Sequence, residues 1–86
     1  MRLEYLCLNE NFLRSVNNLY MLPCLRHLYV RYNRLTEFGD IEGLLNVENL
    51  TELDISSNPL SRKYGYRLII LQKMPSLTVL DSQVTI

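Results

Sequence analysis

The sequence predicts an α/β solenoid, in which short strands stack into a parallel sheet and each strand is followed by a return segment. Three observations predict this fold: leucine accounts for 18 of 86 residues, one leucine pattern recurs three times, and the segments between the copies have a period of three. A chain of this length is expected to form a single domain over residues 1–86. Repeats of this kind bury a core only by stacking on their neighbours.

The recurring unit is an eleven-residue pattern, LxxLxLxxNxL, in which x is any residue. It begins near Leu3, Leu25 and Leu50. A truncated copy begins at Leu77. Within the pattern, apolar side chains alternate with other residues, which indicates a short strand with one buried face. We therefore expect Leu6, Leu28 and Leu53 to lie next to one another in the core.

An asparagine occupies the ninth position of each full copy. These residues are Asn11, Asn33 and Asn58. The chain must turn at this position, and an asparagine side chain can bond to backbone groups that the turn leaves unpaired. Stacking therefore predicts a structural ladder of asparagines, and the alternative is three unconnected surface turns.

The return segments carry apolar residues three positions apart. The first series contains Leu13, Val16, Leu19 and Leu22, and the second has one more step of the same size. A 3₁₀ helix has three residues per turn, so this period favours 3₁₀ or irregular returns over regular α-helices. The extra step explains why the second repeat has 25 residues where the first has 22.

The last third of the chain, about residues 59–86, departs from the repeat. Tyr66, Ile69, Ile70 and Met74 lie at helical spacing together with Lys73. Pro75 is expected to end this helix, because the residue before a proline avoids the α region. A terminal helix would cover the leucines at the end of the solenoid, so we interpret this segment as a C-terminal cap.

No comparable segment precedes the first repeat, and we therefore expect no N-terminal cap. The strand at that end keeps an unpaired edge. Two hypotheses follow, namely that the chain is a fragment of a longer repeat array, or that its open end supports self-association.

The repeated pattern with its ninth-position asparagine resembles the leucine-rich repeat family, and the 22-residue spacing resembles the class named after a regulator of type-1 protein phosphatase. This resemblance implies a right-handed superhelix with the sheet on its concave face. The order Asn58-Pro59, Tyr66-Arg67 and Leu80-Asp81 is similar to the cap of intracellular members. Among these are the A-prime protein of the U2 spliceosomal particle and an axonemal dynein light chain. Tyr66, Arg67, Leu80 and Asp81 are thus the expected cap residues.

The strand residues between the leucines are expected on the concave face. They include Tyr5, His27, Tyr29, Arg31, Tyr32, Glu52 and Asp54. Tyrosine and arginine are enriched at binding hot spots, so we hypothesise that this face binds one helix or loop of a protein partner. Glu52 and Asp54 would select a basic group at one side. The alternative is that these are solvated strand residues, paired to each other.

Several kinds of chemistry are not expected. Nine basic and nine acidic residues give zero formal charge, which argues against direct binding to nucleic acid. No apolar run approaches the roughly 20 residues that cross a bilayer, so no membrane partner is expected. His27 and Cys7 lack a third group for nucleophilic catalysis. Together with Cys24, these two residues do not have the spacing of metal ligands. We therefore expect no catalytic activity, no bound metal and no cofactor.

The sequence therefore predicts a protein-interaction scaffold without catalytic activity. Two cysteines and the absence of an export signal favour a location inside the cell, in the cytoplasm, the cytoskeleton or cilium, or the nucleus. The resemblance leaves open a ribonucleoprotein component that acts through an RNA-binding partner, a ciliary or cytoskeletal component, and a phosphatase regulator. Four basic residues near the cap could reach phosphate: Arg62, Lys63, Arg67 and Lys73.

Overall fold

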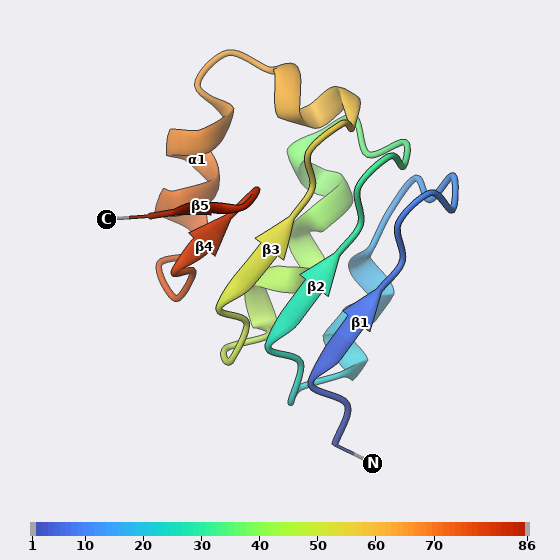
Figure 1. The fold of residues 1–86 in the computed structure, drawn as a ribbon, viewed down its shortest axis with the longest axis vertical. Helices are drawn as coiled ribbons and strands as arrows, with labels where there is room; N and C mark the ends of the chain where they lie inside the picture. Colours follow the sequence, from blue (N-terminus) through green and yellow to red (C-terminus); the bar gives the residue numbers. More distant parts are fainter. Residues whose placement is uncertain (1, 86) are drawn as a thin grey trace.

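Successive repeats place their strands side by side, as Figure 1 shows. The computed structural model describes residues 2–85. Four parallel strands follow one another in the sheet: β1 (Tyr5–Cys7), β2 (His27–Tyr29), β3 (Glu52–Asp54) and β4 (Val79–Leu80). In this register Leu6 pairs with Leu28, and Leu28 pairs with Leu53. The predicted stacking of the repeat leucines is confirmed.

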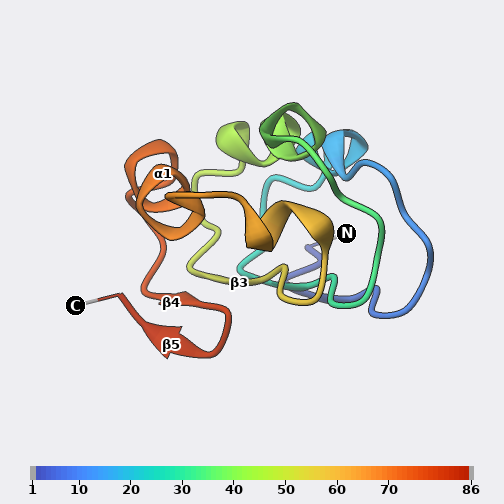
Figure 2. The same cartoon turned by 90° about the horizontal axis from the view of Figure 1, so that it is seen from above.

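The return segments form a second layer behind the sheet (Figure 2). Two of them are 3₁₀ helices, η1 (Asn17–Met21) and η2 (Phe38–Asn46), as the period of three predicts. In η2 this period turns Ile41 and Leu44 inward, and both are fully buried. The core lies between the two layers.

Burial of the leucines decreases toward the first repeat. Leu28 and Leu53 are completely buried, whereas Leu6 and Leu8 are only partly buried against the same core. Within residues 2–85, β1 pairs only with β2, so the outer side of the first repeat lacks a neighbouring repeat.

The C-terminal segment covers the other end of the stack. After the short 3₁₀ helix η3 (Pro59–Arg62), the chain turns at Gly65 with φ 72° and enters α1 (Tyr66–Lys73). Tyr66 and Ile70 point into the core, and the helix ends before Pro75, as expected.

A fifth strand, β5 (Gln83–Val84), pairs antiparallel to β4. The sequence did not predict this strand. Asp81 and Ser82 form the intervening turn with φ 52° and 66°. Two-residue turns of this kind usually carry Asn-Gly or Asp-Gly, and neither pair stands here. The hairpin therefore has no strong local signal.

The asparagine ladder connects the repeats at their turns. Asn33 accepts hydrogen bonds from the backbone N–H groups of Asn11 (2.9 Å) and Leu13 (2.8 Å), and donates to the Leu8 carbonyl (2.9 Å). Asn58 likewise accepts from the Leu35 N–H (3.0 Å). The structure places the Asn11 side chain outside this ladder, because no preceding repeat lies beside it among the described residues. That side chain is exposed and donates only locally, to the Asn9 carbonyl.

Candidate functional site

Three aromatic side chains cluster on the open face of the sheet. The register places Tyr5 opposite His27 and Cys7 opposite Tyr29. The Tyr5 ring centroid lies 5.3 Å from that of Tyr29 and 6.3 Å from that of His27. Tyr5 is 59% exposed, so this cluster presents aromatic surface to solvent.

Glu52 on β3 holds the cluster in place. The Tyr29 hydroxyl donates to Glu52 Oε2 at 2.8 Å, and His27 Nδ1 lies 3.6 Å from Glu52 Oε1. Burial raises the pKa of Tyr29 to about 12, and the hydrogen bond and charge of Glu52 act in the same direction. The hydroxyl therefore stays protonated and keeps donating near neutral pH. Glu52 Oε2 thus orients Tyr29, while the Glu52 side chain remains 29% exposed.

Asp54 was expected on the accessible face but is buried, with only 4% of its surface exposed. Its Oδ1 accepts hydrogen bonds from the Ser56 N–H (3.1 Å) and hydroxyl (2.6 Å). The turn between β4 and β5 covers it, with the Ser82 hydroxyl 3.4 Å from Asp54 Oδ2. Arg31 Nε lies 3.9 Å from the same oxygen. Among the described residues Arg31 Nε has no hydrogen-bond partner, so Asp54 lies near Arg31 without bonding to it. Because Asp54 is buried, it is not available to select a basic group.

Arg31 and Tyr32 continue the face beyond the end of β2. The Arg31 guanidinium carbon lies 5.6 Å from the Tyr32 ring centroid, which is a cation–π distance. Tyr32 is exposed and has φ 57°. Six of the seven expected face residues therefore lie on neighbouring strands or strand ends and remain at least partly accessible, namely Tyr5, His27, Tyr29, Arg31, Tyr32 and Glu52.

The structure brings the four expected cap residues together at the opposite end. The Tyr66 hydroxyl donates to Asp81 Oδ2 (2.7 Å), while Asp81 Oδ1 accepts from the Ile55 N–H (2.8 Å). Arg67 donates to the Leu80 carbonyl at 3.1 Å. Burial raises the pKa of Asp81 although both hydrogen bonds oppose that effect. These contacts tie α1 to β4 and indicate a structural role.

A family model described as leucine-rich repeat matches residues 1–85. The chain belongs to the leucine-rich repeat family. The predicted family and solenoid fold are thereby confirmed, and the match covers both the repeats and the cap.

Relatives show where in this family the chain lies. The human U2 small nuclear ribonucleoprotein A' is 38% identical over 84 residues, covering 95% of this chain and 33% of the relative. The chain therefore spans about a third of the length of that relative. This identity confirms the resemblance to the A-prime protein that the cap predicted. Membership in the leucine-rich repeat family points to a protein-interaction domain.

Solved structures of leucine-rich repeat proteins match the fold closely. The Mex67 leucine-rich repeat domain from Chaetomium thermophilum has a TM-score of 0.85 at 27% identity, over 96% of this chain and 58% of that one. The Drosophila melanogaster SNF/U2A' complex has a TM-score of 0.71 at 27% identity, over 96% of this chain and 62% of that one.

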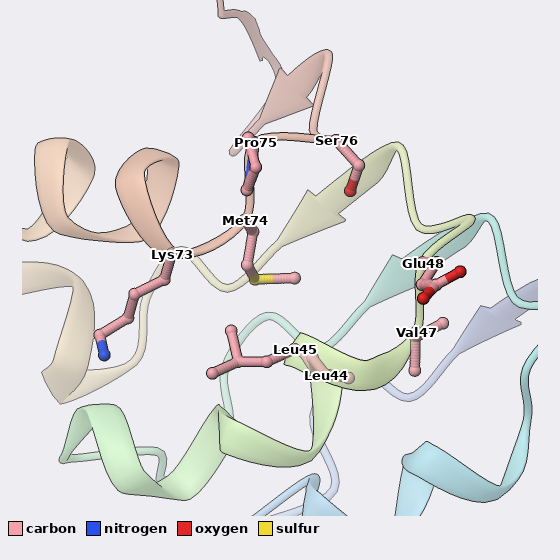
Figure 3. Close-up of a pocket in the computed structure, with 8 residues that line it drawn as sticks. All are labelled: Leu44, Leu45, Val47, Glu48, Lys73, Met74, Pro75 and Ser76. Carbon is pink, nitrogen blue, oxygen red and sulfur yellow. The ribbon is translucent and has the colours of Figure 1, made fainter.

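The clearest pocket of this leucine-rich repeat domain lies away from the sheet face. It separates η2 from the end of α1, and Figure 3 shows Met74 pointing toward Leu45 across it. Its volume is about 200 Å³. Pockets for small organic ligands usually measure about 300–1,000 Å³, so this one is a packing gap between cap and solenoid.

Other chemistry is limited within residues 2–85. His27 is directed to Glu52, whereas Cys7 lies opposite Tyr29, so the considered cysteine–histidine pair does not form a site. No group of three metal-ligating side chains gathers in that range. Nor does any helix there combine the length and the apolar character that crossing a bilayer demands.

One surface feature had no counterpart in the sequence reasoning. Phe12 is exposed, and the Arg34 guanidinium carbon lies 4.8 Å from its ring centroid. Both residues follow the ninth-position asparagine of their repeat, outside the strand pattern from which the binding face was inferred. The available signal was their common tenth position in adjacent repeats, which places them side by side.

Proposed function

We propose that this chain is a non-catalytic protein-interaction scaffold whose concave face receives one helix or loop of a partner. The exposed aromatic cluster on β1 and β2 carries this proposal. Tyr5 packs against His27 and Tyr29 and not within the core, so its area is available to a partner. Aromatic surface of this kind contributes most of the binding energy at many interfaces.

The cluster is also held in place before a partner arrives. Glu52 fixes the Tyr29 hydroxyl, and Asp54 lies beneath Arg31. Side chains that already occupy their bound positions lose less conformational entropy on association. This preorganisation favours a binding role for the face over the alternative, in which these residues only pair with each other.

A ribonucleoprotein component is the second candidate. Its support is the 38% identity to U2 small nuclear ribonucleoprotein A' and the likeness to a chain of the SNF/U2A' complex. We propose that the chain acts through a protein partner of the SNF kind, and that it works in the nucleus. The relatives named above give no support to the ciliary, cytoskeletal and phosphatase alternatives.

Direct RNA binding through the cap is not part of this proposal. Arg67 bonds to the carbonyl groups of Leu80, Gln83 and Val84, and Lys63 pairs with Glu37 at 3.1 Å. Of the four basic cap residues, these two are therefore occupied. The remaining positive charge is too small to bind a phosphate backbone strongly.

Calorimetric titration with purified Drosophila SNF tests the proposal. We expect the wild-type chain to bind, and the double variant Tyr29→Ala/Tyr32→Ala to bind at least about a hundredfold more weakly, because two hot-spot side chains are lost. Tyr20→Ala is the matched control, since Tyr20 is as exposed as Tyr32 but lies on η1, away from the sheet face. Unchanged affinity in a double variant with a native circular dichroism spectrum would contradict the concave-face proposal.

A further inference from the structure

A row of exposed side chains runs along the outer side of η2, away from the sheet. A 3₁₀ helix places residues three positions apart on one face, so Glu42, Leu45 and Glu48 form one row, and all three are exposed. Leu45 is 40% exposed although it stands between two acids. Tyr20 on η1 is 56% exposed on the same layer. These four residues are here called the return strip.

The register of the repeats aligns Tyr20 with Leu45. The strands that follow the two returns pair His27 with Glu52, and Tyr20 and Leu45 lie equally far before this pair along the chain. The two exposed apolar side chains therefore hold the same place in adjacent returns.

Hydrogen bonds between η1 and η2 fix this alignment. The Asn17 side chain accepts from the Gly43 N–H (2.7 Å) and donates to the Gly39 carbonyl (2.9 Å). The Val16 N–H donates to the Asp40 carbonyl at 2.9 Å. Because the backbone beneath the return strip is already ordered, a partner loses little conformational entropy by binding there.

The return strip ends at the gap between η2 and the cap. Leu44, Leu45 and Val47 line one side of this gap, and Met74 and Pro75 line the other (Figure 3). Its volume of about 200 Å³ is too small for most organic ligands, but its apolar walls suit one apolar side chain of a protein. Apolar surface with a charged rim is typical of sites that bind proteins.

The charges along the return strip are two acids, with one base beyond them. Glu42 and Glu48 take part in no ion pair within residues 2–85, and neither does Lys73, which lines the gap at its cap end. Figure 3 shows Lys73 and Glu48 on opposite sides of Leu45. The strip is therefore acidic along η2, and Lys73 disfavours a further basic group at the cap end.

The arginines at the other end of η2 do not cancel this acidic character. Arg14 and Arg34 line a separate depression, which they share with the Asp40 carboxylate. None of the ion pairs formed within residues 2–85 joins either arginine to Glu42 or Glu48. Charge complementarity along the return strip thus favours a partner with basic residues.

We propose that the return strip docks an amphipathic helix of a protein partner, with basic residues at both ends of its apolar stripe. Six residues separate Glu42 from Glu48, which is about 12 Å at the rise of a 3₁₀ helix. Side chains seven positions apart on an α-helix are separated by about 10.5 Å, which matches this distance. Apolar residues between them would cover Tyr20 and Leu45 or enter the gap.

A helix fits the return strip better than an extended segment does. A helix pairs its own backbone groups, whereas an extended segment would bring unpaired backbone groups against apolar side chains. The return strip goes beyond the proposed function, because it uses none of the residues of the sheet face and implies a second contact on the opposite layer.

Fluorescence anisotropy with defined helical peptides tests the return strip. The probe is a fluorescein-labelled, alanine-rich helix with two lysines about two turns apart and leucines between them. One matched peptide carries glutamates in place of the lysines, and the other carries alanines in place of the leucines. We expect the full chain to bind the probe at least about tenfold more tightly than either matched peptide, because each of these lacks one kind of contact.

Variants of the chain locate the contact. Tyr20→Ala should weaken binding of the probe about tenfold, and Glu42→Gln and Glu48→Gln should each weaken it about threefold, as for exposed ion pairs. Tyr64→Ala and Glu10→Gln are the matched controls, because both residues are exposed but lie outside the return layer. These two variants should leave the affinity unchanged.

The outcomes separate this proposal from its competitors. Equal binding of the probe and either matched peptide, no binding at low salt, or equal losses in the control variants would overturn the return strip. So would self-association of the chain that Tyr20→Ala abolishes, since that result assigns the strip to a second copy. Tyr20→Ala should lose the probe and retain SNF, whereas Tyr29→Ala/Tyr32→Ala should do the reverse, so the failures of the two proposals are distinguishable.

Discussion

At the scale of single residues, Asn33 and Asn11 have the same position in their repeats but different surroundings. Asn33 is buried and makes hydrogen bonds to the backbone of both repeats, whereas Asn11 is exposed and bonds only to Asn9. Asn33→Ala should lower the free energy of unfolding by about 3 kcal/mol or more, because several buried backbone groups lose their partners. Asn11→Ala should change it by less than about 0.5 kcal/mol. Urea unfolding of both variants measures the difference, and equal losses would contradict the ladder.

Asp40 gives a pH-dependent prediction. Hydrogen bonds from the N–H groups of Glu37 and Thr36 hold its pKa below the ordinary value of 3.8. A lowered pKa in the folded state means that the charged form stabilises the fold above pH 3.8, and that this contribution disappears as the pH falls through the folded-state pKa. Asp40→Ala should therefore cost about 1 kcal/mol at pH 7, as for other lost helix caps. The cost should shrink by pH 2, and thermal unfolding that shows the same cost at both pH values would contradict this origin.

The surroundings of Asn11 and Asp54 depend on contacts that the local sequence pattern does not contain. The ninth-position pattern identified all three asparagines, yet the role of Asn11 depends on whether a repeat lies beside it. Asp54 was placed on the accessible face by strand alternation, but the turn at Ser82 covers it. In both cases a neighbouring segment decides the outcome, and the local pattern contains no information about that segment.

At the scale of elements, the close approach of η1 and η2 depends on Gly43. A Cβ atom at this position would lie 2.1 Å from the Asn17 carbonyl oxygen, whereas one at Gly39 would meet nothing within 4 Å. Gly43→Ala should therefore destabilise the fold by about 1–3 kcal/mol through overpacking. Gly39→Ala lies in the same helix and should stay within about 0.5 kcal/mol of the wild type. Chemical unfolding of the pair tests the packing, and a Gly43→Ala variant as stable as Gly39→Ala would contradict it.

Elements in which apolar residues recur at a regular spacing could be predicted from the sequence, and elements without such a spacing could not. The three-residue spacing from Leu13 to Leu22 and its counterpart in the second repeat specify 3₁₀ returns, since one face of such a helix must meet the core. Pro75 marks the end of α1 because its ring constrains Met74. The hairpin of β4 and β5 rests instead on the Arg67 contacts to carbonyl groups of both strands, which come from another element.

At the scale of the whole molecule, the two ends of the solenoid differ. α1 and β5 cover one end, whereas β1 forms the edge of the sheet at the other and Leu6 and Leu8 are only partly buried there. Open sheet edges promote association with other strands. For residues 1–86 taken by themselves, we propose that this edge pairs with a second copy, and we expect the weight-average mass in sedimentation equilibrium to rise with concentration. A constant monomer mass across the accessible range would contradict this proposal.

The central claim is that the aromatic cluster of β1 and β2 is the surface that a protein partner contacts. Amide chemical-shift mapping of the labelled chain during titration with SNF tests it most directly. The account predicts the largest changes at Tyr5, His27, Tyr29 and Tyr32, with small changes on η1 and η2. Saturable binding whose changes fall on η1, η2 or α1, with the sheet face unaffected, would contradict it.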